Sequence, residues 1–384
     1  MKPFRYVVPT EIFLEPGCFN TLGEHARRFG SKPLVVTGRR SARENGTTGR
    51  ALAQLPGAVL FEEVDENPHT AVCEAGAEVC RNEGCDCVVA VGGGSALDAA
   101  KAVALLARNP GPCSRYFGAD RYENPNLPIV AVPTTAGTGS EATPYSVLVD
   151  KANNSKHTVA GRSLFPKVAL LDPELSMTMP RDVTVSTGLD ALSQAMEGMV
   201  SHKSTPMGDA LALEACRVIN EWLPKAADEP EDLEAREHML YAAMLSGCVI
   251  AQSGTTLVHG MGYQYTLKFG LPHGLANALL LTPLFRHNAA FLPEKVAQVA
   301  AALGCAAQPQ PEPASAGVAA AVHGLLNRLG VSPAAGDAGV DGGALHDMAD
   351  AIFNDPPRRK NQPGDLTRDD ILRFFQESFE GRTD

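Results

Sequence analysis

The chain has 384 residues, which is too long for one ordinary hydrophobic core, so its length predicts two domains. Apolar residues make up 44% and charged residues 20%, as in globular proteins, and a formal net charge of -11 argues against a nucleic-acid-binding surface. No apolar run has the length of a transmembrane helix, and nine cysteines without disulfide spacing favour reduced thiols in a cytoplasmic protein.

The first 180 residues alternate between strand patterns and helix patterns. Buried strands are expected at Pro33–Thr37, Ala58–Phe61, Val88–Val91, Ile129–Pro133 and Val168–Leu171, with a strand pair at Tyr145–Val149 and Lys156–Ala160. Helices are expected between several of these strands, at 19–29, 51–55, 71–82 and after Ser95. Such alternation is typical of a parallel sheet with helices on both faces. Phe4–Val8 and Glu11–Leu14 are two further extended pieces, which we expect to form a hairpin or a paired edge.

Strand signals stop near residue 180, and helix patterns dominate beyond it. The expected helices are Gly188–Met199, Met207–Trp222, Asp232–Ile250, Thr256–Lys268, Gly274–Leu284 and Lys295–Leu303. We therefore predict an α/β domain over residues 1–180 and an all-helical domain over residues 181–384. The proline-rich segment 308–313 is interpreted as an exposed loop within the second domain.

Three glycines follow the buried strand Val88–Val91 and lead into a helix. Gly92, Gly93 and Gly94 provide a backbone that a phosphate can approach closely, because no Cβ stands in the way. Ser95 is the expected cap of the helix, whose first N–H groups and dipole favour an anion. The motif predicts a diphosphate site, while a tight turn between strand and helix is an equally good interpretation of these residues alone.

A second loop of small and hydroxyl-bearing residues follows the strand Ile129–Pro133. It runs from Thr134 to Glu141 and offers hydroxyl and N–H groups to a phosphate, a ribose or a nicotinamide amide. Its expected cofactor contacts are Thr134, Thr135 and Thr138. Gly38 and Asn67 also follow expected strands, and parallel sheets bind their ligands at the carboxyl ends of strands. Two such loops in one domain favour nucleotide binding over simple turns.

The helical half carries a second group of polar residues. Asp190 and Gln194 are four residues apart and therefore lie on one helix face. His259 and His273 are each followed by glycine. We predict that Asp190, His259 and His273 hold a divalent cation with one position left for substrate, although each histidine taken alone is more commonly a hydrogen-bonded core residue.

These motifs together resemble the iron-containing (group III) alcohol dehydrogenases along nearly the whole chain. The matching pieces are Gly92–Ser95 with Asp98 and Lys101, Pro133–Glu141, Gly188–Leu192, His259-Gly260 and Pro272–Gly274. The resemblance implies a dinucleotide-binding domain, a helical domain, and hydride transfer between a nicotinamide cofactor and a small aldehyde or alcohol. It adds Asp98 and Lys156 as cofactor contacts and implies Fe²⁺ held by one Asp and three His. With the extended N-terminal pieces, it also suggests a homodimer that pairs its edge strands.

One ligand position departs from the family pattern. Gln194 stands where the family has its third histidine, and an amide oxygen is a weaker ligand for iron or zinc than an imidazole. Three outcomes stay open: a weak Fe²⁺ or Zn²⁺ site that uses Gln194, a three-ligand site completed by water, and a metal-free enzyme. Tyr263 stands where many relatives carry a histidine near the nicotinamide. Without metal, His259, His273 or Tyr263 would donate the proton to the substrate oxygen.

The residues after the strand Pro33–Thr37 bear on the choice of cofactor. Relatives specific for NAD tend to carry Asp at the position of Gly38, where it bonds the ribose 2′-hydroxyl. A small residue leaves room for a 2′-phosphate, and Arg39, Arg40 and Ser41 supply donors for it. We therefore predict a preference for NADP over NAD of about ten-fold or more. Arginines merely solvated in a surface turn are the alternative.

Other functions are compatible with parts of the sequence. A lyase of the dehydroquinate-synthase type shares the architecture, and a maleylacetate-reductase-like enzyme would work without metal. Gln194 also fits a non-catalytic dinucleotide-binding protein. The loop 134–141 and the surroundings of His259 and His273 resemble the dehydrogenases instead. Neither a nucleic acid nor a membrane is an expected partner.

Overall fold

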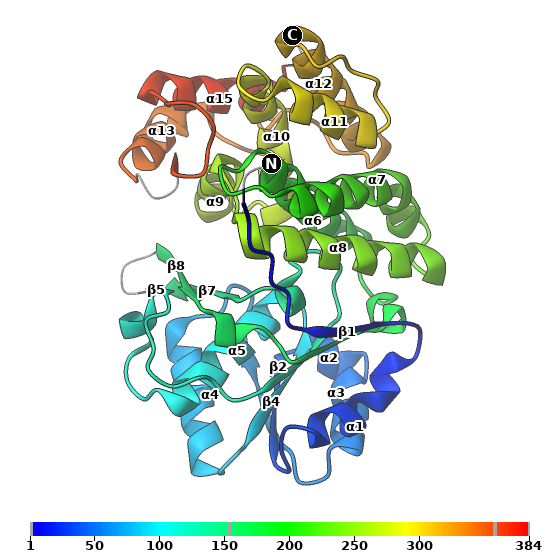
Figure 1. Cartoon of the computed structure of the whole chain (residues 1–384), viewed down its shortest axis with the longest axis vertical. Coiled ribbons are helices and arrows are strands. Elements are labelled where there is room, and N and C mark those ends of the chain that lie inside the picture. The colour runs from blue at the N-terminus through cyan, green and yellow to red at the C-terminus, as the bar shows by residue number, and fades with distance from the viewer. Residues whose placement is uncertain (1–2, 152–154, 356–358, 383–384) are drawn as a thin grey trace. The chain divides into compact units, whose positions relative to one another are not determined.

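The computed structural model describes residues 3–151, 155–355 and 359–382. Contacts divide the chain into two units (Figure 1): Val7–Met179, and Pro180–Asp384 together with the segment that ends at Tyr6. Tyr6 belongs with the helices because its hydroxyl donates to the carbonyl oxygen of Cys248 at 2.9 Å. Residues 3–6, which the sequence analysis placed in the α/β domain, therefore pack with the helical unit.

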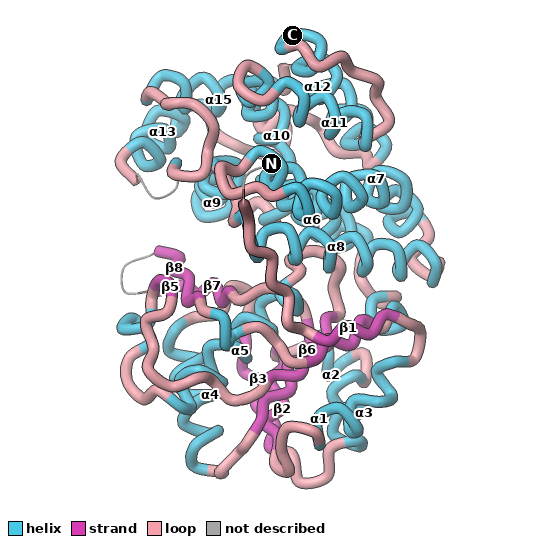
Figure 2. The backbone as a smooth tube through the Cα atoms, in the orientation of Figure 1, coloured by secondary structure: helices cyan, strands magenta, loops and turns pink. Residues whose placement is uncertain are grey.

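A six-stranded parallel sheet forms the centre of the first unit (Figure 2) and has the order β1-β9-β6-β4-β2-β3. Its strands are β1 (Glu11–Leu14), β2 (Pro33–Gly38), β3 (Val59–Val64), β4 (Cys87–Gly92), β6 (Ile129–Pro133) and β9 (Val168–Leu171). Because every pairing is parallel, the carboxyl ends of all six strands lie along one edge of the sheet. The predicted cofactor loops begin at that edge.

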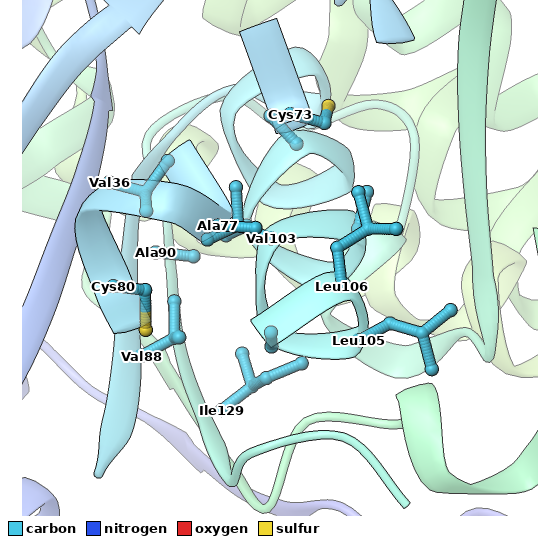
Figure 3. Packing of buried hydrophobic residues seen from close by; sticks show 14 of the residues in the cluster. Val36, Cys73, Ala77, Cys80, Val88, Ala90, Val103, Leu105, Leu106 and Ile129 are labelled. Atoms are coloured by element: carbon cyan, nitrogen blue, oxygen red, sulfur yellow. The ribbon is translucent and has the colours of Figure 1, made fainter. Parts of the chain in front are cut away.

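Helices cover both faces of this sheet, as predicted. They are α1 (Leu22–Arg27), α2 (Ser41–Glu44), α3 (Thr47–Gln54), α4 (Thr70–Asn82) and α5 (Gly94–Arg108). On one face Val36 and Val88 pack with α4 and α5, as Figure 3 shows. The neighbouring residues Val35 and Val89 point into a separate core with α1 and α3. Burial on both faces explains why these strands read as unbroken apolar runs.

A smaller sheet of three strands has the order β5-β8-β7. It consists of β5 (Gly118–Ala119), β7 (Tyr145–Asp150) and β8 (Ser155–Ala160), and the antiparallel pair β7–β8 confirms the predicted strand pair. Of the two alternatives predicted for the N-terminal extended pieces, the hairpin is wrong, and the paired edge is confirmed for Glu11–Leu14 alone. Glu11–Leu14 pairs in parallel with β9, where Phe13 packs against a core, while the described residues 3–10 form no strand.

The second unit is helical, and its described residues from 180 onward contain no strand. Its helices are α6 (Arg181–Val200), α7 (Pro206–Asp228), α8 (Leu233–Ser253), α9 (Leu257–Phe269), α10 (His273–Ala289), α11 (Pro293–Ala302), α12 (Pro311–Arg328), α13 (Leu345–Phe353) and α15 (Arg368–Glu380). The segment 308–313 is not wholly a loop, because Pro311 begins α12 at a position where a helix tolerates proline. Among the described helices none alone could cross a membrane, whereas α8 and α9 meet the length and composition test as a pair bent by 113°.

Helix α6 is buried along most of its length and packs against α7, α8 and α10. Asp190, Gln194 and Glu197 nevertheless project polar groups into this apolar surrounding. Burying such groups is costly unless they are hydrogen-bonded or bind a ligand. These three residues therefore mark the place in the helical unit where a functional site is to be sought.

Candidate active site

Three predicted ligands converge in the helical unit. Asp190 of α6, His259 of α9 and His273 of α10 each offer a ligand atom, and these atoms all lie within 4.8 Å of one another. Oδ1 of Asp190 is 3.4 Å from Nε2 of His259 and 3.8 Å from Nε2 of His273. Asp190 and His259 are buried, and His273 is partly exposed. This arrangement leaves one side of the cluster accessible.

The glycine after His273 explains how α10 comes so close to α6. A Cβ at Gly274 would lie 1.8 Å from the carbonyl oxygen of Ser186 and 2.8 Å from the backbone nitrogen of Asp190. Any side chain at position 274 would therefore push the two helices apart. Contact between the two backbones sets the separation of Asp190 and His273.

Gln194 lies beside Asp190, one helical turn further along α6. Its Nε2 donates to Oδ2 of Asp190 at 3.0 Å, while Nδ2 of Asn277 donates to Oδ1 at 3.2 Å. The carboxylate is thus held through both oxygens. Oε1 of Gln194 is buried and has no hydrogen-bond partner among the described residues. An orphaned amide oxygen, two imidazoles and a carboxylate are a donor set that fits a divalent transition metal.

Glu197 is a member of this cluster that the sequence analysis missed. The side chain is fully buried, and its Oε1 accepts from the backbone nitrogen of Thr256 at 2.8 Å, from the Thr256 hydroxyl at 2.9 Å and from the backbone nitrogen of His259 at 3.2 Å. Oε2 contacts Nδ1 of His259. Its spacing of seven residues from Asp190, on the same face of an apolar helix, was the available signal.

The charges of the cluster compensate one another. Burial lowers the pKa of His259, but the carboxylates of Glu197 and Asp190 outweigh this effect and raise that pKa to about 10. Burial raises the pKa of Asp190, while the hydrogen bond from His259 and the charge of His273 bring that pKa below its usual value. Without a cation, a proton on His259 offsets part of the negative charge of the two carboxylates.

Tyr263 lies against the exposed side of the cluster. Its ring stacks on His273 with a centroid distance of 4.8 Å and an interplanar angle of 14°. The ring of His273 meets that of His259 nearly edge-on, at 5.3 Å and 73°. The structure thus brings together His259, His273 and Tyr263, the three residues expected to take part in catalysis.

In the other unit, the glycine turn joins β4 to α5. Gly92 has a φ of 146°, which L side chains rarely adopt, and a Cβ there would lie 2.8 Å from Cβ of Ala96. The helix begins at Gly94 with Gly93 as its cap, so the prediction that Ser95 caps it is wrong. Ser95 lies inside the first turn, where its hydroxyl accepts from the backbone nitrogen of Asn67 at 3.2 Å.

The glycines also let the second loop lie directly on this helix start. A Cβ at Gly94 would be 2.5 Å from Cγ2 of Thr138, and one at Gly93 would be 3.2 Å from Cγ2 of Thr135. The space beside the Gly94 α-carbon, which the sequence analysis assigned to phosphate, is filled by Thr138. The two predicted loops therefore form one surface that combines hydroxyl groups with the first N–H groups of α5.

Three other residues were expected to contact the cofactor: Asn67, Asp98 and Lys156. Nζ of Lys156 donates to Oδ1 of Asn67 at 2.7 Å, which joins two of the predicted residues. Asn67 has a φ of 55°, a left-handed conformation that asparagine tolerates better than most residues. Asp98 instead directs its carboxylate to the hydroxyl of Ser140 and the backbone nitrogen of Val147.

The residues expected to choose the cofactor follow β2. Gly38 is its last residue, and a Cβ there would find its nearest neighbour, the carbonyl oxygen of Val64, at 3.7 Å. Arg39 forms an ion pair with Asp65 at 2.9 Å. Arg40 is exposed, and Ser41 begins the short helix α2.

Comparison with known proteins gives the family. The family model described as "Iron-containing alcohol dehydrogenase" matches residues 9–173. A second model, for the C-terminal domain of the Fe-containing alcohol dehydrogenase family, matches residues 184–379. A probable alcohol dehydrogenase, EutG of Salmonella typhimurium, is 39% identical over 96% of this chain and 93% of its own. The NAD-dependent methanol dehydrogenase of Bacillus methanolicus is 34% identical over 78% of this chain and 80% of its own.

Solved structures agree with this assignment. A 1,3-propanediol oxidoreductase superposes with a TM-score of 0.93 at 33% identity and covers 98% of this chain and 100% of its own. The chain therefore belongs to the iron-containing alcohol dehydrogenase family. The predicted fold class is confirmed. The prediction that the protein is an oxidoreductase that interconverts alcohols and aldehydes with a nicotinamide cofactor is also confirmed.

Proposed function

We propose that this protein interconverts small primary alcohols and aldehydes with NADP(H), at a divalent cation held by Asp190, His259 and His273. The observation that supports this most directly is the convergence of these three ligand atoms within 4.8 Å, next to the orphaned amide oxygen of Gln194. Relatives named as methanol and 1,3-propanediol dehydrogenases support a small substrate.

Each residue of the cluster has a defined part in this proposal. The cation, when bound, would act as a Lewis acid on the substrate oxygen. Glu197 keeps a proton on Nδ1 of His259, so that Nε2 is the atom directed at the ligand cluster. Gln194 and Asn277 orient the carboxylate of Asp190. The nicotinamide, when bound, would supply or accept the hydride at the carbonyl carbon.

Proton transfer is assigned to the accessible side of the cluster. The side chain of His273 is 29% exposed, and Tyr263 stacks on it. In the aldehyde-reducing direction with a cation bound, we propose that the Tyr263 hydroxyl delivers the proton that ends on the substrate oxygen, because Nε2 of His273 then holds the cation. In a protein without bound metal, His259, His273 or Tyr263 would carry this step, so a metal-independent reductase is a second candidate. The replacement of the family's histidine by Gln194 is the observation that favours it.

The preference for NADP rests on the end of β2. Arg40 and Ser41 offer donors to a 2′-phosphate, while the ion pair with Asp65 uses part of the capacity of Arg39. The small Gly38 supports the same choice because it provides no acceptor for a ribose hydroxyl. Cofactor contacts are proposed for the remaining predicted residues, namely Asn67, Gly92, Gly93, Gly94, Ser95, Thr134, Thr135, Thr138 and Lys156.

Two further proposals concern the setting of the protein. Strand β1 is an edge of the six-stranded sheet, and we propose that two copies pair through this edge in a homodimer. All nine cysteines are free thiols, which supports a location in the reducing cytoplasm. Sedimentation at micromolar concentration would test the first proposal, and a monomeric mass would count against it.

Metal content and activity, measured on the same purified protein, test the function. We expect turnover of a small aldehyde with NADPH that rises with added Fe²⁺ or Zn²⁺ and falls with a chelator. Asp190→Ala should remove the bound metal. Chelator-resistant turnover by metal-free protein would favour the second candidate. Binding of NADPH with no turnover across an aldehyde panel would contradict both.

A further inference from the structure

Helix α5 holds the loop 134–141 at a point that the proposed catalytic steps do not use. Lys101 of α5 is fully buried. Its Nζ lies 2.6 Å from the carbonyl oxygen and 2.7 Å from the hydroxyl oxygen of Ser140, 3.1 Å from the hydroxyl of Thr143 and 2.7 Å from the carbonyl oxygen of Tyr145. An ammonium group has three protons, so these oxygens take up its whole hydrogen-bonding capacity.

Asp98, one turn earlier on α5, also forms hydrogen bonds with the segment 140–147. Its Oδ1 accepts from the Ser140 hydroxyl at 2.6 Å, and its Oδ2 accepts from the backbone nitrogen of Val147 at 2.9 Å. The Ser140 hydroxyl therefore accepts from Lys101 and donates to Asp98. The two charged groups are 3.8 Å apart.

This charged pair is expensive to bury. Desolvation lowers the pKa of Lys101 to about 8 and raises the pKa of Asp98, although each charge stabilises the other. Buried ion pairs of this kind often stabilise a fold no better than apolar residues of the same volume. Their hydrogen bonds instead fix one particular arrangement of the segment 140–147.

The same helix holds the loop a second time, at its own start. Gly93 and Gly94 are in close contact with Thr135 and Thr138. The loop therefore contacts α5 at Thr135 and Thr138 and again at Ser140, and the expected cofactor contact Thr134 directly precedes the first of these contacts.

We propose that Asp98 and Lys101 are positioning residues that hold the loop 134–141 against the start of α5, so that loop hydroxyls and helix N–H groups form one preorganised dinucleotide surface. The proposal rests on the cofactor role given to these loops above. It replaces the expected direct contact between Asp98 and the cofactor. A loop that is ordered before binding does not lose conformational entropy when the dinucleotide arrives, so its ordering lowers the dissociation constant.

Three variants of the full-length protein test this role. Lys101→Met keeps most of the side-chain volume but removes the ammonium group. Ser140→Ala removes only the hydroxyl that links Lys101 to Asp98. Ser146→Ala is the matched control, because the hydroxyl of Ser146 donates to the backbone oxygen of Asp98 at 2.7 Å and is not bonded to the loop.

The readouts are NADPH binding by fluorescence titration, amide hydrogen exchange of residues 134–141 in cofactor-free protein, and steady-state kinetics. For Lys101→Met we expect the dissociation constant of NADPH and its KM to rise by about ten-fold or more, with faster exchange in the loop and little change in kcat at saturating cofactor. Ser140→Ala should show the same changes in smaller measure, and Ser146→Ala should show none of them.

Unchanged NADPH affinity in both Lys101→Met and Ser140→Ala would overturn the proposal and leave the proposed function intact. Faster exchange without weaker binding would overturn it as well, because the pair would then serve structure alone. If the unmutated protein bound neither NADPH nor NADH, the proposed function would itself fail. Should Lys101→Met not fold, Ser140→Ala decides, since it keeps the ammonium group and its bonds to two backbone carbonyls.

Discussion

Replacing Glu197 by glutamine tests whether this carboxylate fixes the proton of His259 on Nδ1. A glutamine side chain has one acceptor oxygen and one NH₂ group. If the oxygen keeps the bonds from Thr256, the NH₂ group faces Nδ1 of His259 and donates to it. The ring proton must then move to Nε2, the atom that lies 3.4 Å from Asp190 and is meant to bind the cation.

The magnitude follows from the bonds that change. The variant loses one hydrogen bond to a charged acceptor, worth about 1.5–3 kcal/mol. Losing the outer partner of a histidine ligand typically weakens metal binding by about 10–100-fold. We therefore expect the dissociation constant for Fe²⁺ or Zn²⁺ to rise by about 10–100-fold, or about 1.4–2.7 kcal/mol.

Competition with a chelator of known affinity measures the dissociation constant, and ¹⁵N NMR of the histidine ring reports which nitrogen carries the proton. Ser193→Ala is the control, because the Ser193 hydroxyl is buried on the same helix but donates only to the backbone oxygen of Asp190 at 2.8 Å. If Glu197→Gln bound metal as tightly as this control, with the proton still on Nδ1, the reasoning would be refuted.

Three other substitutions probe the remaining assignments. Gln194→His should raise Fe²⁺ or Zn²⁺ affinity by about ten-fold, because it offers a third nitrogen ligand in place of an amide oxygen; unchanged affinity in chelator competition would show that residue 194 is not a ligand. Gly38→Asp should reverse or erase the preference for NADP, measured as the ratio of kcat/KM with NADP to kcat/KM with NAD, because the space beside Gly38 admits a side chain: a Cβ there meets nothing closer than 3.7 Å. Equal kcat/KM with both cofactors in the unmutated protein would contradict the assignment. Gly94→Val should abolish dinucleotide binding by forcing Thr138 away from the helix start, and calorimetry that finds normal affinity would mean that the glycines serve only a turn.

Periodicity was sufficient to predict most of the sheet, because each central strand is buried on both faces and is an unbroken apolar run. The prediction located Ile129–Pro133 and Val168–Leu171 at the bounds that the structure has. It also gave the bounds of Glu11–Leu14 but not the partner of that strand, which lies more than 150 residues away. Such a pairing depends on the order of strands in the finished sheet, which local pattern does not contain.

The site was predictable only in part. Asp190, His259 and His273 carry ligand chemistry in their side chains, so residue type and spacing were enough to suggest them. Glu197 acts through a contact with the ring of His259, 62 residues later in the chain, and nothing in its own neighbourhood indicates that partner. The close approach of Thr138 to Gly94 was likewise hidden, because it depends on where the loop 134–141 lies.

The contact between Gly274 and the backbone of α6 has a mechanical consequence. A helix spacing that is set by side chains adjusts when their rotamers change. Two main chains in contact cannot adjust in this way, because they have no rotamers to change. With a hypothetical Cβ at 274 only 1.8 Å from a carbonyl oxygen, helices α6 and α10 are already at their closest approach. Mutations in the distant core can therefore reshape the apolar packing of the unit while the gap that the proposed cation would span keeps its width.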